Sequence, residues 1–96
     1  MLKQLARKQL FDAPQDQCFW VNNGPILQNL RDLERALKSG AISEAQFKYH
    51  VSRGKNDFSA WIKDVLHDEQ AAKALARVKT LKTAARILSE HLQRFK

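Results

Sequence analysis

The sequence predicts an all-α domain, a compact bundle of about five short helices that follow an amphipathic N-terminal arm and a short extended segment. Apolar residues recur at helical spacing in several stretches. The 96 residues include only three glycines and two prolines, fewer than a sheet-rich fold with many turns needs. We also find no pair of alternating runs that would join as strands. The length suits one hydrophobic core.

The first 14 residues form the predicted arm. Leucines recur at helical spacing on one side of it, at Leu2, Leu5 and Leu10, and basic residues lie on the other side. Pro14 and its polar neighbours then interrupt the pattern. We therefore divide the chain into an arm, residues 1–14, and a single helical domain, residues 15–96.

A short extended segment and a turn follow. Residues 18–21 are the one β-like run, and we expect them to lie on the core without a strand partner. Phe19 and Trp20 are adjacent, so one should fill the core while the other covers it or meets a partner. Residues 22–25, Asn-Asn-Gly-Pro, then turn the chain.

Two helices are predicted next. The first spans residues 25–39, where Ile26 begins an apolar stripe that continues at Leu30, Leu33 and Leu37. The second begins directly after Ser43, because Ser43 and Gln46 have the spacing of a capping box. Ile42 and Phe47 match the hydrophobic staple that accompanies such a box. Gly40 and Gly54 are placed to end the two helices.

Three more helices complete the domain. Asn56 or Asp57 caps the third, whose apolar residues follow a clean helical pattern and should be buried: Phe58, Trp61, Ile62, Val65 and Leu66. Asp68 caps an alanine-rich fourth helix that extends to about Val78. Thr80 caps the fifth, whose inner stripe comprises Leu81, Ala84, Ala85, Leu88, Leu92 and Phe95.

Three segments carry a resemblance to a known family. They read FWVNNG at residues 19–24, FKYHV at residues 47–51 and NDFSAWIKDV at residues 56–65. In these positions the chain resembles a small microbial family of helical domains of unknown function. The resemblance covers about residues 19–88. It implies a shared fold and brings no activity with it.

Catalytic chemistry has little support in the sequence. A metal site could in principle draw on three histidines and three aspartates, namely His50, His67, His91, Asp57, Asp64 and Asp68. A histidine beside a helix cap is more often a capping or solvated residue. Cys18 as a nucleophile would need a base such as His50, and a small apolar cysteine is the simpler interpretation. We expect no enzymatic activity and no cofactor.

Positive charge is the main functional hint. The chain carries a formal net charge of +7, and residues 71–96, with seven Lys or Arg and one Glu, carry +6 of it. Candidate contacts for nucleic acid or an acidic partner are Lys73, Arg77, Lys79, Lys82, Arg86 and Arg94. Such a face suits phosphate contacts, although a lysine-rich helix is often only solvated.

Trp20, Tyr49 and His50 are candidate contacts for a protein partner. For Tyr49 we favour a hydroxyl that satisfies a neighbouring helix end or an aspartate over a surface contact. The sequence thus predicts a non-enzymatic binding or regulatory accessory domain that acts through protein interaction. The alternative is a sequence-independent DNA- or RNA-binding protein that uses its basic C-terminal helix. A single cysteine and the lack of a long apolar run favour the cytoplasm and give no reason to expect a membrane partner.

Overall fold

The computed structural model describes residues 10–52 and 54–95. Its elements, in chain order, are the 3-10 helix η1 (Gln15–Gln17), strands β1 (Phe19–Trp20) and β2 (Ile26–Leu27), helices α2 (Leu30–Ser39) and α3 (Glu44–His50), strands β3 (Val51–Ser52) and β4 (Lys55–Asn56), and helices α4 (Asp57–Asp64), α5 (Glu69–Leu75) and α6 (Leu81–Leu92).

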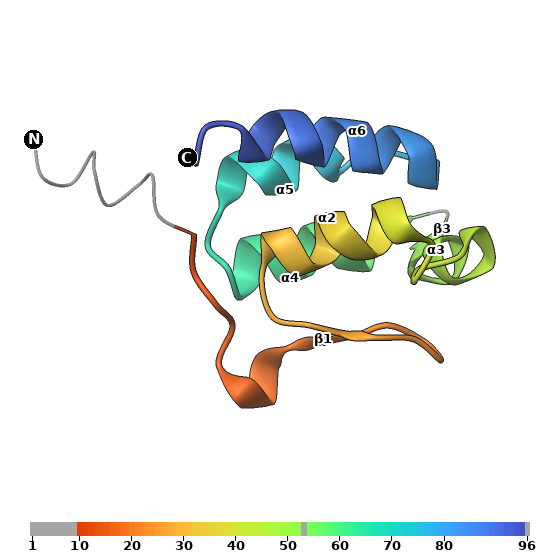
Figure 1. The fold of residues 1–96 in the computed structure, drawn as a ribbon, viewed down its shortest axis with the longest axis horizontal. Coiled ribbons are helices and arrows are strands. Elements are labelled where there is room, and N and C mark those ends of the chain that lie inside the picture. Colours follow the sequence, from red (N-terminus) through yellow and green to blue (C-terminus); the bar gives the residue numbers. More distant parts are fainter. Residues whose placement is uncertain (1–9, 53, 96) are drawn as a thin grey trace, which may run out of the picture.

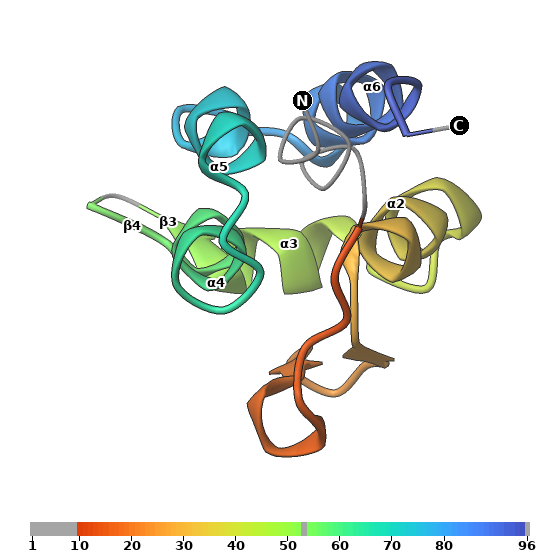
Figure 2. The ribbon, with the colours of Figure 1, turned by 90° about the vertical axis from the view of Figure 1, so that its left-hand side faces the viewer.

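The helices form two layers (Figure 1, Figure 2). Helices α5 and α6 make the upper layer, with α4 beneath α5 and α2 beneath α6. Helix α3 lies across one end of the lower layer, roughly perpendicular to α2 and α4. The hairpin of β1 and β2 lies below the lower layer, on the side of the domain opposite to α5 and α6.

The prediction that the domain is all-α is wrong. The described residues include two antiparallel two-stranded sheets, one formed by β1 and β2 and the other by β3 and β4. Phe19 lies opposite Leu27, and Trp20 lies opposite Ile26. Residues 18–21 therefore contain a strand with a partner. The domain is a small mixed structure in which helices predominate.

The sequence analysis missed strand β2 because Ile26 also fits the apolar stripe of the following helix. Ile26 continues the helical spacing of that stripe, so the predicted helix began at residue 25, five residues too early. In the structure Asn29 is the N-cap, and its Oδ1 accepts the backbone N–H of Asp32 at 2.8 Å. The Asp32 carboxylate in turn accepts the N–H of Gln28 at 3.0 Å. These contacts begin the helix at Leu30 and leave Ile26 and Leu27 free to pair with β1.

The second hairpin replaces the predicted end of a helix. Helix α3 ends at His50, before the expected stop at Gly54, and Val51 and Ser52 pair with Asn56 and Lys55. Gly54 has a φ of 79°, in the left-handed region that favours glycine. Gly54 therefore belongs to the turn between β3 and β4 and does not end a helix.

The predicted starts of the other four helices are confirmed. Ser43 Oγ accepts the N–H of Gln46 at 3.1 Å, and Gln46 Oε1 accepts the N–H of Ser43 at 2.7 Å, which completes the capping box. Helices α4, α5 and α6 are capped by Asn56, Asp68 and Thr80. Each of these side chains accepts the backbone N–H of the residue three positions further along. These starts depend on residues within three positions, so the sequence could predict them.

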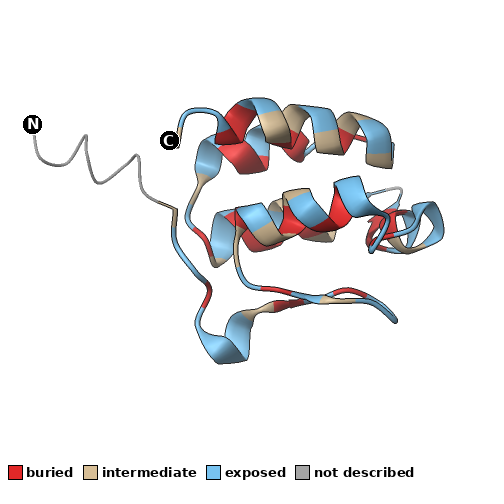
Figure 3. Cartoon of the chain, in the orientation of Figure 1, coloured by how far each residue is buried: buried red, intermediate tan, exposed pale blue. Residues whose placement is uncertain are grey.

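The core lies between the two layers and between the lower layer and the hairpin (Figure 3). Phe47, Phe58, Trp61 and Ile62 are buried, as predicted. Val65, the C-cap of α4, is only half-buried, whereas Leu66 after it is buried. No helix among the described residues is long and apolar enough to cross a membrane.

The predicted arm lies mostly outside the described residues, which begin at residue 10. Ala13, near its end, is 2% exposed and belongs to the core. Its backbone N–H donates to the carbonyl oxygen of Gln28 at 2.7 Å, and the Asp12 carboxylate accepts the side-chain amide of Asn29 at 2.7 Å. The end of the arm therefore runs beside the β1–β2 hairpin.

Candidate functional site

The β1–β2 hairpin has one apolar face turned inward and another turned outward. Phe19 and Leu27, which lie opposite each other, are 8% and 1% exposed. Trp20 and Ile26, the next pair, are 72% and 55% exposed. We call Trp20 and Ile26 the hairpin face. It places an indole and a branched aliphatic side chain together in solvent, because residues opposite each other on one face of a sheet are neighbours.

The turn of the hairpin is fixed to α3. Asn23 has a φ of 57°, a left-handed conformation that asparagine tolerates. The Gln46 side-chain amide donates to the carbonyl oxygens of Asn22 and Asn23, both at 3.0 Å. A Cβ at Gly24 would lie 2.8 Å from Val21 Cγ1 and 2.9 Å from Gln46 Nε2. Glycine is needed here because the turn packs so closely against its own strand and α3.

His50 holds the same turn from the inside. Its Nε2 accepts the backbone N–H of Asn22 at 3.0 Å, and its Nδ1 lies 2.9 Å from Oδ2 of Asp57. A nitrogen that accepts an N–H carries no proton, so the neutral ring must carry its proton on Nδ1 and donate it to Asp57. The ring is 6% exposed. His50 therefore positions the hairpin from its inner side and does not present its ring to a partner.

An aromatic cluster anchors the inner side of the hairpin. The Phe19 ring stacks on Phe58 with a centroid distance of 4.7 Å, and the edges of His50 and Trp61 approach it at 4.9 and 5.6 Å. The Trp61 indole N–H donates to the carbonyl oxygen of Gln17 at 2.8 Å. The hairpin is thus held at its start, its inner face and its turn, which makes the hairpin face a rigid surface.

Ile26 is the surface residue that the sequence reasoning missed, since it was assigned to a helix. One signal could have found it. Residues 17–30 contain no charged side chain, although 28% of the chain is charged. Depletion of charge with exposed aromatic side chains is typical of the centre of a protein interface.

Tyr49 is exposed on α3. The side chain is 57% exposed, and the Lys55 ammonium lies 5.2 Å from the centre of its ring. The expected hydrogen bond from its hydroxyl is absent within the described residues. Lys55 also contacts the Asp57 carboxylate at 3.3 Å, so Tyr49 is part of a charged surface and differs in that respect from the hairpin face.

The predicted basic residues are all exposed. Lys73, in the last turn of α5, and Lys82, in the first turn of α6, lie on either side of the connection that carries Arg77 and Lys79. Further along α6, Arg86 pairs with Glu90 at 3.3 Å.

Arg94 is separated from the other predicted basic residues. It donates to the Gln70 side chain at 3.2 Å, beyond the C-terminal end of α6. We define the α5–α6 cation cluster as Lys73, Arg77, Lys79 and Lys82, and exclude Arg86 and Arg94 from it.

Four of the six histidines and aspartates considered for a metal site fall into two separate pairs, and the other two, His67 and Asp64, are exposed. His50 pairs with Asp57, and His91 Nε2 lies 2.9 Å from the Asp68 carboxylate. Asp68 also caps α5 by accepting the N–H of Ala71 at 3.0 Å. Nowhere in the described ranges do three or more potential ligands gather around a common point. These pairs connect helix ends and account for both buried histidines.

Cys18 has no base beside it in the described structure. Its thiol points to the carbonyl oxygen of Pro14 at 3.6 Å, and both ring nitrogens of His50 are engaged elsewhere. The arrangement does not provide the base that a cysteine nucleophile needs.

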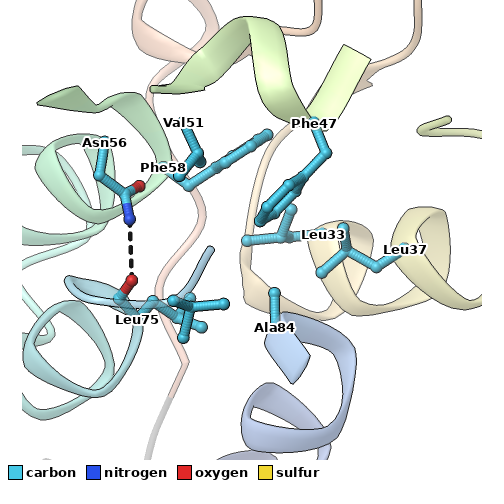
Figure 4. A pocket seen from close by; sticks show the side chains of 9 residues that line it. Leu33, Leu37, Phe47, Val51, Asn56, Phe58, Leu75 and Ala84 are labelled. Atoms are coloured by element: carbon cyan, nitrogen blue, oxygen red, sulfur yellow. Dashed lines mark hydrogen bonds between the residues drawn. The ribbon is translucent and has the colours of Figure 1, made fainter. Parts of the chain in front are cut away.

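An apolar pocket lies between the helical layers (Figure 4). It has a volume of about 10 Å³ and is lined by Leu33, Leu37, Phe47, Val51, Asn56, Phe58, Leu75, Val78 and Ala84. This volume is about what a single water needs. The side-chain amide of Asn56, its polar lining group, already donates to the Leu75 carbonyl oxygen at 2.8 Å. The pocket is a small packing gap in the core, too small for an organic ligand.

Comparisons with known proteins add no relative: no family model, no curated protein and no solved structure matches this chain.

Proposed function

We propose that the chain is a non-enzymatic protein-binding domain that presents the hairpin face to a protein partner. The observation that carries this proposal is the exposure of Trp20, at 72%, beside Ile26, at 55%, on a hairpin that three sets of contacts hold in place. Exposed tryptophan on a rigid support is the usual anchor of a protein interface, because few side-chain conformations are lost on binding.

The surroundings of the hairpin face indicate the chemistry of the partner. The nearest polar residues along the chain, including Asn22, Asn23 and Gln28, are exposed and uncharged. They can form a hydrogen-bonding rim around an apolar centre, as in specific interfaces. We therefore propose a partner with an apolar pocket for the indole and no requirement for charge. The cytoplasm is the compartment we propose, in keeping with the free thiol of Cys18.

A photo-crosslinker tests this function in cells. With p-benzoylphenylalanine at position 20, the full chain should form a covalent adduct of defined mass with one protein. The matched control carries the same group at Lys48, an exposed position of α3. An adduct formed at position 20 and not at position 48 supports the proposal. No adduct at position 20, or the same adducts from both positions, would contradict it.

A further inference from the structure

The α5–α6 cation cluster lies in a part of the chain that has no acidic residue. Residues 70–89 contain five Lys or Arg and no Asp or Glu. The chain reverses between α5 and α6, and their connection lies at one end of the upper layer (Figure 1). The connection and the helix turns that adjoin it carry four of these cations, Lys73, Arg77, Lys79 and Lys82. All four are exposed.

The cluster is not neutralised within the described part of the chain. Elsewhere on the surface, ion pairs at 3.3 Å join Arg35 to Asp32, Lys38 to Glu34, Lys55 to Asp57 and Arg86 to Glu90. The four cations of the cluster form no such pair with a described residue.

The start of α6 adds to the positive potential. Helices α2, α3, α4 and α5 each carry an acidic residue in the first turn, which compensates the positive end of the helix dipole. Helix α6 carries none, and Lys82 lies there instead. The dipole and the side-chain charges therefore act in the same direction.

We infer that the α5–α6 cation cluster binds the phosphodiester backbone of nucleic acid without reading its sequence. A protein interface would need an apolar centre, and lysine is depleted in such interfaces. The exposed large apolar side chains, Phe11, Trp20, Ile26 and Tyr49, all lie outside residues 70–89. Phosphate binding needs only cations and polar donors, which this surface supplies, with the Thr80 and Thr83 hydroxyls close by. Aromatic residues for base stacking are absent from residues 70–89, so the contacts are to the backbone.

This surface is distinct from the hairpin face. The hairpin lies below the lower helical layer, whereas α5 and α6 form the upper layer in both views (Figure 1, Figure 2). A protein and a nucleic acid could therefore bind at the same time, and the domain would connect them.

Fluorescence anisotropy with a labelled 20-base-pair duplex tests the inference on the full chain. Four phosphate contacts predict a log-log salt slope of about −3.6, so affinity should fall roughly a hundredfold between about 50 and 200 mM salt. The double variant Lys79→Glu with Lys82→Glu should lose most binding and lower the slope to about −1.8. Acidic residues at the start of a helix are stabilising, so this variant should fold at least as well as the wild type.

The matched control reverses two exposed lysines outside the cluster, Lys48→Glu with Lys63→Glu. It changes the net charge equally and should keep at least a third of the affinity. Trp20→Ala should bind the duplex as the wild type does, which separates this inference from the proposed protein interface. Three results would each overturn it: no binding at tens of micromolar protein, equal losses in the two double variants, or binding to a labelled polyglutamate peptide but not to the duplex.

Discussion

The backbone N–H of Asn22 donates to Nε2 of His50 at 3.0 Å, a contact between the hairpin turn and the last residue of α3. It determines which nitrogen of the ring carries the proton. The exposed hairpin face thus depends on a histidine that is itself buried.

Replacing His50 by phenylalanine should destabilise the domain. The ring volume is nearly kept, but the Asn22 N–H loses its acceptor and the Asp57 carboxylate loses a donor. The loss of such a part-buried hydrogen bond costs about 1 kcal/mol. Urea unfolding should show a loss of that size, and the Asn22 amide should exchange faster with deuterium. Tyr49→Phe, at an exposed neighbour, is the control and should change neither quantity. Unchanged stability in His50→Phe would contradict this role.

Gly24→Ala should also destabilise the domain, because the added methyl group would lie too close to neighbouring atoms. Gly24 does not have the left-handed backbone that Gly40 and Gly54 have, so an added methyl group meets no torsional penalty. It would, however, approach Val21 Cγ1 to 2.8 Å, and overpacking of this kind costs about 1–3 kcal/mol. A thermal melt measures the loss. A variant as stable as the wild type would show that the turn can move away from α3.

Substitutions of Trp61 test the packing of the core. Trp61→Ala removes a buried indole that contacts Phe19 and bonds to the Gln17 carbonyl oxygen. Such a truncation costs about 3–5 kcal/mol, enough to unfold many domains of this size. Trp61→Phe keeps the ring packing and loses mainly the hydrogen bond, so it should cost about 1 kcal/mol. Circular dichroism melts should rank the two variants in that order, and the reverse order would contradict the packing described here.

Glu34 should make stability depend on pH. The 2.6 Å hydrogen bond from Ser89 holds the pKa of Glu34 below its ordinary value, Lys38 lowers it further, and partial burial opposes both. The folded protein therefore binds this proton more weakly than the unfolded chain does. The resulting stabilisation is present above the ordinary carboxyl pKa and is lost as pH falls through the lowered, folded pKa.

Ser89→Ala should move the pKa of Glu34 up towards its ordinary value. Its urea midpoint should fall below that of the wild type at neutral pH, and the two midpoints should approach each other at acidic pH, as pH falls through the lowered pKa of Glu34. Ser52→Ala, at an exposed serine of β3, serves as the control and should follow the wild type throughout. A Ser89→Ala midpoint below the wild type by the same margin at both pH values would contradict the linkage.

The sequence predicted four helix starts that short-range contacts decide, but it missed the Asn29 cap of α2, which has the same spacing. The capping box of Ser43 and Gln46 and the caps at Asn56, Asp68 and Thr80 depend on neighbours three residues away, and all of them are present. The buried face of α4 followed from its apolar spacing.

The strands were missed because contacts with residues outside the strands determine their pairing. Ile26 fits a helical stripe equally well, and its place in β2 depends on the Asn29 cap and on the turn held by Gln46 and His50. Contacts outside the strand also determine that Trp20 is the outer residue. Alternation showed that Phe19 and Trp20 must face opposite ways, but only the cluster of Phe58 and His50 determines that Phe19 is the inner one.

The grouping of the basic residues also could not be predicted from the sequence alone. On one helix, Lys79, Lys82 and Arg86 have the spacing of a single face, yet Arg86 pairs with Glu90 in the structure. The reversal between α5 and α6 groups Lys79 and Lys82 with Lys73 and Arg77 instead.

The central claim is that the hairpin face binds a protein, and isothermal titration calorimetry tests it most directly. The purified partner from the position-20 crosslink is titrated with the wild type, with Trp20→Ala and with Lys48→Ala as the control. Trp20 is largely exposed, so its truncation should leave the thermal melt unchanged. As a central anchor it should contribute at least about 2 kcal/mol to binding. We predict that Trp20→Ala weakens the affinity roughly thirtyfold or more, with Lys48→Ala within about twofold of the wild type; equal affinities for Trp20→Ala and the wild type would contradict the claim.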